Sequence, residues 1–154
     1  FETVRIKGCK MKSIYIETFG RFAVFIDGQP LLFKNLKAKE LLAYLIDNEG
    51  DFVSNKDIIT TLWKNRINDV SLKRSFRYTL RLLRDAFNAE GIDDLFDVGY
   101  GVVKINRNRI TCDYYEFIKG NTEAYPYKDD YMYGYEWAES TRRRIEERQS
   151  RSNK

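Results

Sequence analysis

Histidine is absent from this chain, and cysteine is scarce. Without an imidazole there is no Ser-His-Asp triad, no Cys-His dyad, no histidine metal ligand and no phospho-histidine relay. The two cysteines, Cys9 and Cys112, have no partners at zinc-ligand spacing, which predicts ordinary reduced thiols. Acidic pairs such as Asp93/Asp94 and Asp129/Asp130 lie in polar loops, where such pairs are usually solvated. We therefore expect no enzyme activity, no metal and no cofactor.

Long apolar runs are missing as well. No apolar stretch approaches the roughly 18 residues of a membrane-spanning helix, so we expect a soluble, cytoplasmic protein without a membrane partner. Of the 154 residues, 43% are hydrophobic and 32% are charged, a balance typical of a globular domain. The chain opens with Phe1 instead of Met, which suggests a piece of a longer protein.

Positive charge is concentrated in one segment. The net charge is only +4, yet the segment from Lys64 to Arg84 contains seven cationic residues and one anionic residue, Asp69. Residues 70–88 contain no Gly or Pro, and their apolar residues recur at helical spacing, which predicts a helix that ends before Gly91. The expected apolar stripe consists of Leu72, Phe76, Leu80, Leu83 and Phe87.

Cations occupy the opposite side of this predicted helix. At three- and four-residue spacing they form a ridge about 16 Å long, in which like charges repel by a few tenths of a kcal/mol per pair. Like charges held together despite this repulsion indicate a polyanionic binding partner. The alternative is that the helix simply exposes an arginine-rich face to solvent. The candidate DNA-binding residues are Lys73, Arg74, Arg77, Tyr78, Arg81 and Arg84. For Tyr78, contact with a base or sugar and partial packing of the ring both remain open.

Shorter elements precede and follow this helix. Alternation over 13–33, with an Asp27-Gly28 turn, predicts an antiparallel sheet whose third strand is Leu31–Phe33. Apolar spacing predicts a helix over 36–47 with Leu36 on its buried side. Ser54 and Asp57 predict the start of a second helix. The later predicted strands are Leu95–Val98, Val102–Ile105 and Arg109–Cys112.

The end of the chain, from Asp113 onward, is aromatic, and we expect irregular structure there followed by a charged helix over about 136–148. The aromatic residues expected to cover the core are Tyr115, Phe117, Tyr131 and Trp137. A stacking platform for single-stranded nucleic acid is the alternative. The acidic residues of this segment disfavour it, because they would repel phosphate.

The order of elements, a sheet followed by three helices and a β-hairpin, predicts an α+β winged helix-turn-helix fold. The chain resembles the winged-helix output domain of OmpR/PhoB-type response regulators, in the branch shared with the Streptomyces-type antibiotic regulatory proteins (SARP family). The matching segments are TFGRFAVFIDGQPL, KAKELLAYLIDNEGDFVSNKDIITTLW, SLKRSFRYTLRLLRDAF, GYGVVKI, CDYYEFIKG and YMYGYEWAEST. The resemblance spans about residues 13–141.

The resemblance implies a division of the chain and an activity. Residues 1–12 would be the linker from a missing N-terminal receiver domain, 13–112 the DNA-binding domain and 113–154 a short helical C-terminal extension. The implied function is sequence-specific binding of double-stranded DNA in the major groove, on tandem half-sites, by the effector domain of a two-component transcriptional regulator. In isolation we expect a monomer or weak dimer. A winged-helix protein-interaction module anchored by Tyr78 and Tyr100 is the alternative function.

The resemblance also assigns residues to roles. The recognition helix would be Ser71–Phe87, with Arg84 nearer the DNA backbone. The amides near Ser54 and Asn55 would meet a phosphate at a helix N-terminus. Residues 64–69 match a loop that contacts RNA polymerase in some relatives, although plain solvent exposure is the alternative.

The predicted wing differs from the family pattern. Relatives often carry an arginine at its tip, whereas here the tip is Gly99-Tyr100-Gly101, where Tyr100 can hydrogen-bond a phosphate. The nearest cation is Lys104, which either contacts the DNA backbone or is an ordinary strand-surface residue.

Overall fold

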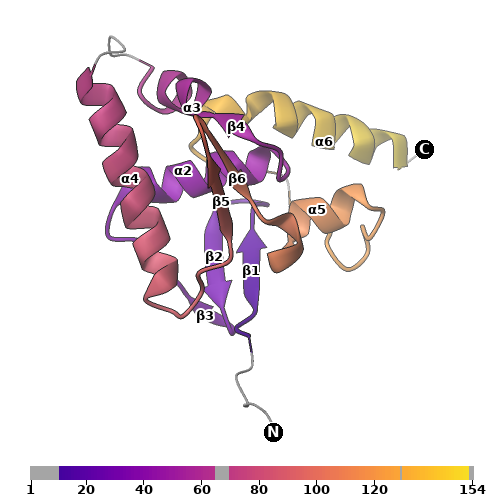
Figure 1. Ribbon diagram of the computed structural model, residues 1–154. Coiled ribbons are helices and arrows are strands. Elements are labelled where there is room, and N and C mark those ends of the chain that lie inside the picture. The colour runs from indigo at the N-terminus through magenta and orange to yellow at the C-terminus, as the bar shows by residue number, and fades with distance from the viewer. Residues whose placement is uncertain (1–10, 65–69, 129, 153–154) are drawn as a thin grey trace, which may run out of the picture.

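The computed structural model describes residues 11–64, 70–128 and 130–152 and shows a mixed α+β fold, as expected (Figure 1). Residues 1–10 of the predicted linker, which include Cys9, and residues 65–69 of the loop expected before the long helix lie outside the described residues. The described helices are α2 (Leu36–Asp47), α3 (Asn55–Leu62), α4 (Val70–Asn88), α5 (Asp113–Ile118) and α6 (Glu139–Ser152). The 3-10 helices are η1 (Arg107–Arg109) and η2 (Glu136–Ala138).

Four strands form the first sheet, in the order β3-β2-β1-β7. These strands are β1 (Ile14–Glu17), β2 (Ala23–Ile26), β3 (Gln29–Pro30) and β7 (Thr111–Cys112). The predicted Asp27-Gly28 turn is confirmed, with φ angles of 50° and 81°. The third strand was wrongly predicted at Leu31–Phe33. Because this turn is so short, pairing with β2 starts at Gln29, and the chain then leaves the sheet.

Helices α2, α3 and α4 pack around one hydrophobic core. The predicted apolar stripe of α4 is buried along its whole length. Helix α2 has the predicted bounds, and its N-cap Asn35 accepts a hydrogen bond from the Ala38 N–H (2.9 Å). Leu36, expected on the buried side, is 77% exposed because it occupies the first position of α2, before the helix meets the core.

The second sheet has the order β4-β6-β5, from β4 (Val53–Ser54), β6 (Val102–Ile105) and β5 (Phe96–Gly99). Strand β6 was predicted with these bounds, β5 lies one residue later than predicted, and β4 was not predicted. The predicted strand Arg109–Cys112 is reduced to β7. Arg109 is instead the last residue of 3-10 helix η1 and Ile110 is its C-cap; at the start of η1 the Asn106 side chain accepts a hydrogen bond from the Asn108 N–H (3.3 Å).

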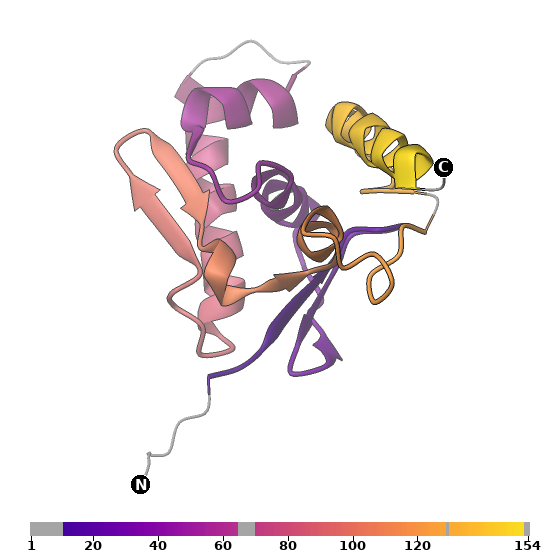
Figure 2. The ribbon, with the colours of Figure 1, turned by 90° about the vertical axis from the view of Figure 1, so that its right-hand side faces the viewer.

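The C-terminal extension packs onto this body. Tyr115, Phe117 and Tyr131 are buried and Trp137 is partly buried, which confirms their predicted role in covering the core. The prediction of irregular structure was wrong at α5, which follows directly from β7. Helix α6 lies on the side of the molecule away from α4 (Figures 1 and 2). The domain limits at 112/113 stay a prediction.

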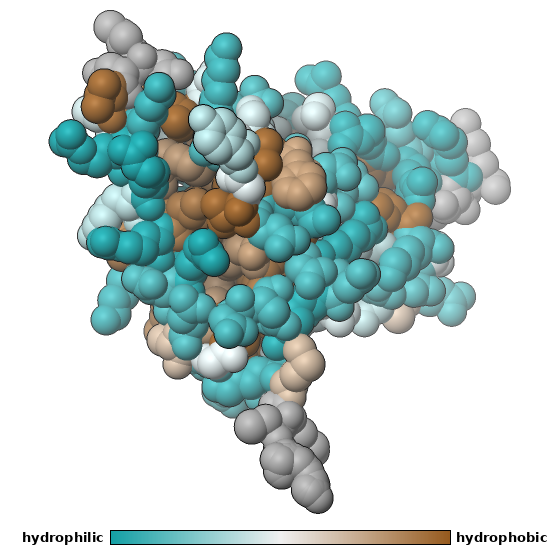
Figure 3. All heavy atoms as spheres, viewed as in Figure 1, coloured by the Kyte–Doolittle hydropathy of each residue, from teal (hydrophilic) through white to brown (hydrophobic). Residues whose placement is uncertain are grey.

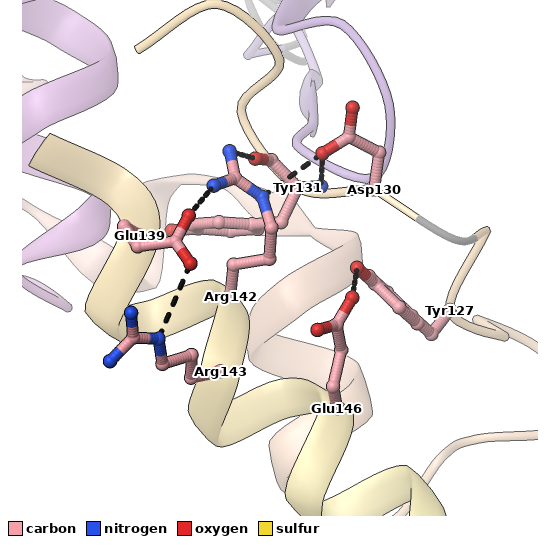
Figure 4. Close-up of polar contacts among 7 residues, drawn as sticks. All are labelled: Tyr127, Asp130, Tyr131, Glu139, Arg142, Arg143 and Glu146. Carbon is pink, nitrogen blue, oxygen red and sulfur yellow. Dashed lines mark hydrogen bonds and ion pairs between the residues drawn. The ribbon is translucent and has the colours of Figure 1, made fainter. Parts of the chain in front are cut away.

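Polar contacts hold α6 in place (Figure 4). Arg142 donates to the Asp130 carboxylate (3.0 Å), to the Tyr131 carbonyl (2.6 Å) and to Glu139 (2.6 Å). The Tyr131 hydroxyl in turn donates to Asp47 on α2 (2.7 Å), and burial raises the pKa of this tyrosine well above its ordinary value. The segment before α6 is therefore attached to α2 as well as to α6.

A buried carboxylate joins the extension to the first sheet. Asp113, the first residue of α5, accepts hydrogen bonds from the Thr18 N–H (2.8 Å), the Thr18 hydroxyl (2.6 Å) and the Phe19 N–H (3.0 Å). It also accepts one from the Tyr114 N–H (2.8 Å). Thr18 and Phe19 directly follow β1 and Tyr114 lies in the first turn of α5, so one side chain accepts hydrogen bonds from both segments.

We expect Asp113→Asn to lower the free energy of unfolding by about 3 kcal/mol, because an amide turns an N–H group toward donors that need an acceptor. Urea unfolding followed by circular dichroism measures the change. Asp93→Asn, at an exposed position, is the matched control and should shift stability by less than about 0.5 kcal/mol. Equal unfolding midpoints for the two variants would contradict this role of Asp113.

Candidate nucleic-acid interface

The outer side of α4 carries the cations that the sequence singled out. All six predicted residues of this helix are exposed: Lys73, Arg74, Arg77, Tyr78, Arg81 and Arg84. Within the described part of the chain, none of these cations forms an ion pair with a carboxylate. Figure 3 shows hydrophilic side chains projecting over α4 at the left edge of the molecule. The ridge is thus a positive surface without internal compensation.

The Tyr78 ring lies beside this ridge and is 52% exposed. The guanidinium carbon of Arg81 lies 5.3 Å from the centroid of the ring, a cation–π arrangement. The tyrosine is therefore neither fully solvated nor packed into the core. Its closest cationic partner is one of the candidate reading arginines.

The N-terminus of α3 lies next to the β5–β6 hairpin. The Ser54 hydroxyl accepts a hydrogen bond from the Asp57 N–H (3.0 Å), which makes it the N-cap. The Asn55 N–H donates to the Gly101 carbonyl in the β5–β6 loop (2.9 Å). Two first-turn amides are thus already occupied. The Lys56 N–H has no acceptor among the described residues and is the amide that an anion can approach.

A hollow of about 410 Å³ lies between α3 and α4. It is lined by Asn55, Lys56, Ile59, Lys73, Phe76 and Arg77. The side-chain oxygen of Asn55 is buried without a hydrogen-bond partner. Sequence reasoning had missed Lys56, although its place two residues after the N-cap Ser54 was a usable signal.

The β5–β6 hairpin presents Tyr100 at its tip, where the side chain is fully exposed. The loop turns through Gly101, which has a φ of 72° that favours glycine. The ammonium of Lys104 lies 4.9 Å from the centroid of the exposed Phe52 ring, on the outer face of the second sheet. Tyr100 is therefore at the tip, whereas Lys104 lies on the body of the hairpin.

Outside this surface, the described residues include one buried thiol, that of Cys112. Burial raises the pKa of the Cys112 thiol, which disfavours the reactive thiolate. In the described residues no group of three or more His, Cys, Asp or Glu side chains could hold a metal ion. Across the same residues, no helix has the length and apolarity to cross a membrane.

Comparison with known proteins gives a likeness of fold. No family model and no curated protein matches the chain. The chain is similar to Mycobacterium tuberculosis EmbR, solved in complex with a low-affinity phosphopeptide, with 23% identity and a TM-score of 0.62. The alignment covers 73% of this chain and 30% of the EmbR chain. The two proteins thus share the fold of the aligned part, which is less than a third of the EmbR chain.

The N-cap of α3 contributes to the stability of the protein in the absence of any ligand, and this contribution can be measured. We expect Ser54→Ala to lower the free energy of unfolding by about 1 kcal/mol, because the Asp57 N–H loses its acceptor. Ser54→Thr keeps a capping hydroxyl and should retain most of the stability. Thermal unfolding of the two variants, compared with the original chain, measures the difference. If the alanine variant is as stable as the threonine variant, the capping role of Ser54 is contradicted.

Proposed function

We propose that this chain is a winged helix-turn-helix domain that binds double-stranded DNA sequence-specifically, as the effector domain of a transcriptional regulator. The observation that carries the proposal is the uncompensated cationic ridge of α4. The apolar side of α4 packs against the rest of the domain, and its cationic side faces outward. A helix of this kind can enter the major groove of DNA. The domain acts as a binding module and not as an enzyme.

The ridge residues divide by their position along α4. Lys73, Arg77 and Arg81 lie on the central ridge and would reach base edges and phosphates, since arginine pairs bidentately with guanine. Arg74 and Tyr78 lie beside them and would also contact bases and phosphates, whereas Arg84 would lie nearer the DNA backbone. Contacts with phosphates set affinity and register, and contacts with base edges set sequence preference.

The surroundings of the ridge supply backbone contacts. The Lys56 N–H at the positive end of the α3 dipole, together with Lys73 and Arg77 around the hollow, suits one phosphate group. The Tyr100 hydroxyl can donate to a second phosphate from the wing tip. Because the Asn55 backbone N–H donates a hydrogen bond to the Gly101 carbonyl, the N-terminus of α3 and the wing would approach the duplex together.

We further propose that the regulator is of the OmpR/PhoB type in its SARP-like branch. The shared fold with EmbR and the matching segments over residues 13–141 support this assignment. It would add an N-terminal receiver domain, tandem half-sites, and RNA polymerase as partner near residues 64–69. Cytoplasmic location follows from this role.

The salt dependence of binding tests the proposal. In duplexes selected from a random pool, we expect Arg77→Ala or Arg81→Ala to weaken binding by about 1–3 kcal/mol. A plot of the logarithm of the association constant against the logarithm of the salt concentration should be linear. Its slope should be about −0.9 for each phosphate that the protein neutralises. Fluorescence anisotropy measures both quantities.

Arg143→Ala is the matched control, since this arginine is 73% exposed in its side chain on α6, away from α4, and should leave binding unchanged. Undetectable or salt-insensitive duplex binding would reject the proposal. Charge reversal at Arg77 and Arg81 that leaves the capture of a protein partner intact would favour the protein-interaction alternative, anchored by Tyr78 and Tyr100.

The Tyr78–Arg81 pair makes a separate prediction. Tyr78→Leu should weaken specific binding by about 0.5–1 kcal/mol, because the ring no longer orders the guanidinium, whereas Tyr78→Phe should bind like the original chain. In an Arg81→Ala background, Tyr78→Leu should then have no further effect, which a double-mutant cycle measures. A phenylalanine variant as weak as the leucine variant would instead assign the hydroxyl a direct contact with a base or sugar.

A further inference from the structure

A cleft separates the C-terminal end of α3 from the segment that leads into α6. Its volume is about 710 Å³, and its walls come from α2, from Thr60–Lys64 and from Gly134–Trp137. Both tryptophans of the chain, Trp63 and Trp137, line it. The cleft is the place where the C-terminal extension meets the helix pair of the proposed DNA-binding surface.

A continuous chain of hydrogen bonds crosses this cleft. The Trp137 indole N–H donates to one carboxylate oxygen of Glu40 (2.9 Å), and the Lys37 ammonium donates to the other (3.1 Å). Lys37 also donates to the Leu62 carbonyl in the last turn of α3 (2.8 Å). Trp137 of the extension is thereby linked through α2 to the end of α3.

Two further links run beside the first. The Tyr44 ring meets the Trp137 ring edge to face, with centroids 5.3 Å apart, and the Thr61 hydroxyl donates to the Tyr44 hydroxyl (3.3 Å). Lys64 forms an ion pair with Glu136. We call these side chains the brace: Lys37, Glu40, Tyr44, Thr61, Lys64, Glu136 and Trp137.

The brace acts on the end of a short helix. Helix α3 has eight residues, and the last carbonyl groups of any helix lack partners within it. Lys37 supplies a partner to the Leu62 carbonyl, and its ammonium also lies 5.4 Å from the centroid of the Trp63 ring. Because α3 carries Lys56 and the hollow at its other end, a displacement of its last turn would move those groups relative to Arg77.

We infer that the brace positions α3 for specific DNA recognition, with Lys37 and Trp137 as positioning residues that need not touch the duplex. This inference rests on the proposed function. Specific binding needs the α3 end, the ridge and the wing in register at the same time, whereas non-specific binding needs mainly positive charge. A weakened brace should therefore reduce discrimination between sequences more than it reduces affinity for DNA in general.

The experiment compares three variants of the full chain. Trp137→Phe keeps an aromatic ring and removes the indole N–H, and Lys37→Met keeps an unbranched apolar stem and removes the ammonium. Lys39→Met is the matched control, because it removes the same charge from the same helix at a position outside the brace. Dissociation constants are measured for a selected duplex and for an unrelated duplex of equal length. Hydrogen exchange is measured at the Trp63 amide, which donates to the Ile59 carbonyl.

We expect Trp137→Phe and Lys37→Met to raise the dissociation constant of the selected duplex about three- to tenfold, the effect of one lost hydrogen bond. The constant for the unrelated duplex should stay within about twofold of the original chain for Trp137→Phe, and of the Lys39→Met control for Lys37→Met. The Trp63 amide should exchange faster in both brace variants and at the original rate in the control.

Three results would overturn the inference. Equal weakening of both duplexes, relative to the original chain for Trp137→Phe and to Lys39→Met for Lys37→Met, would show that the brace has no role in discrimination between sequences. Faster exchange with unchanged discrimination would leave the brace as a structural contact only. Failure of the original chain to bind any duplex would reject the proposed function and the positioning role with it, and in that case the exchange rates still report whether the brace holds α3.

Discussion

The burial of one stripe of α4 is the constraint on which the rest of the structure depends. Leu72, Phe76, Leu83 and Phe87 enter the core that α2 and the sheets complete. An α-helix rotates by 100° per residue, so burial of these positions leaves the cations three and four residues apart on the outside. The charge pattern of the surface is thus a consequence of how the core packs.

Around α4, single polar groups join segments that are distant in sequence. Asp113 joins α5 to the end of β1, and the Asn55 amide joins α3 to the β5–β6 loop. Such bonds are short and directional, so each one limits the relative position of two elements more narrowly than apolar contact does. The brace between the extension and α3 belongs to the same class of contact. The aromatic side chains of the extension also share the core with the helices.

Local signals in the sequence were sufficient for the long and capped elements. The bounds of α2 follow from its apolar period, and the start of α3 follows from Ser54 and Asp57. Strand β3 and helix α5 were misplaced or missed, because segments of two to six residues have too few positions to show a period. Their structure is decided by partners elsewhere: β2 for β3, and the Thr18 amide and hydroxyl for the first turn of α5.

The candidate site divides in the same way. The sequence by itself determined the cationic stripe of α4, its buried counterpart and the tyrosine at the tip of the β5–β6 hairpin, because helical periodicity and a glycine-framed turn are local properties. Only the tertiary structure decided that the Asn55 backbone N–H donates to the Gly101 carbonyl and that Lys56 borders the hollow with Arg77. It also decided that the Trp137 indole donates a hydrogen bond to Glu40 of α2. These relations join residues tens of positions apart, and their geometry depends on the packing of whole elements, which no local pattern encodes.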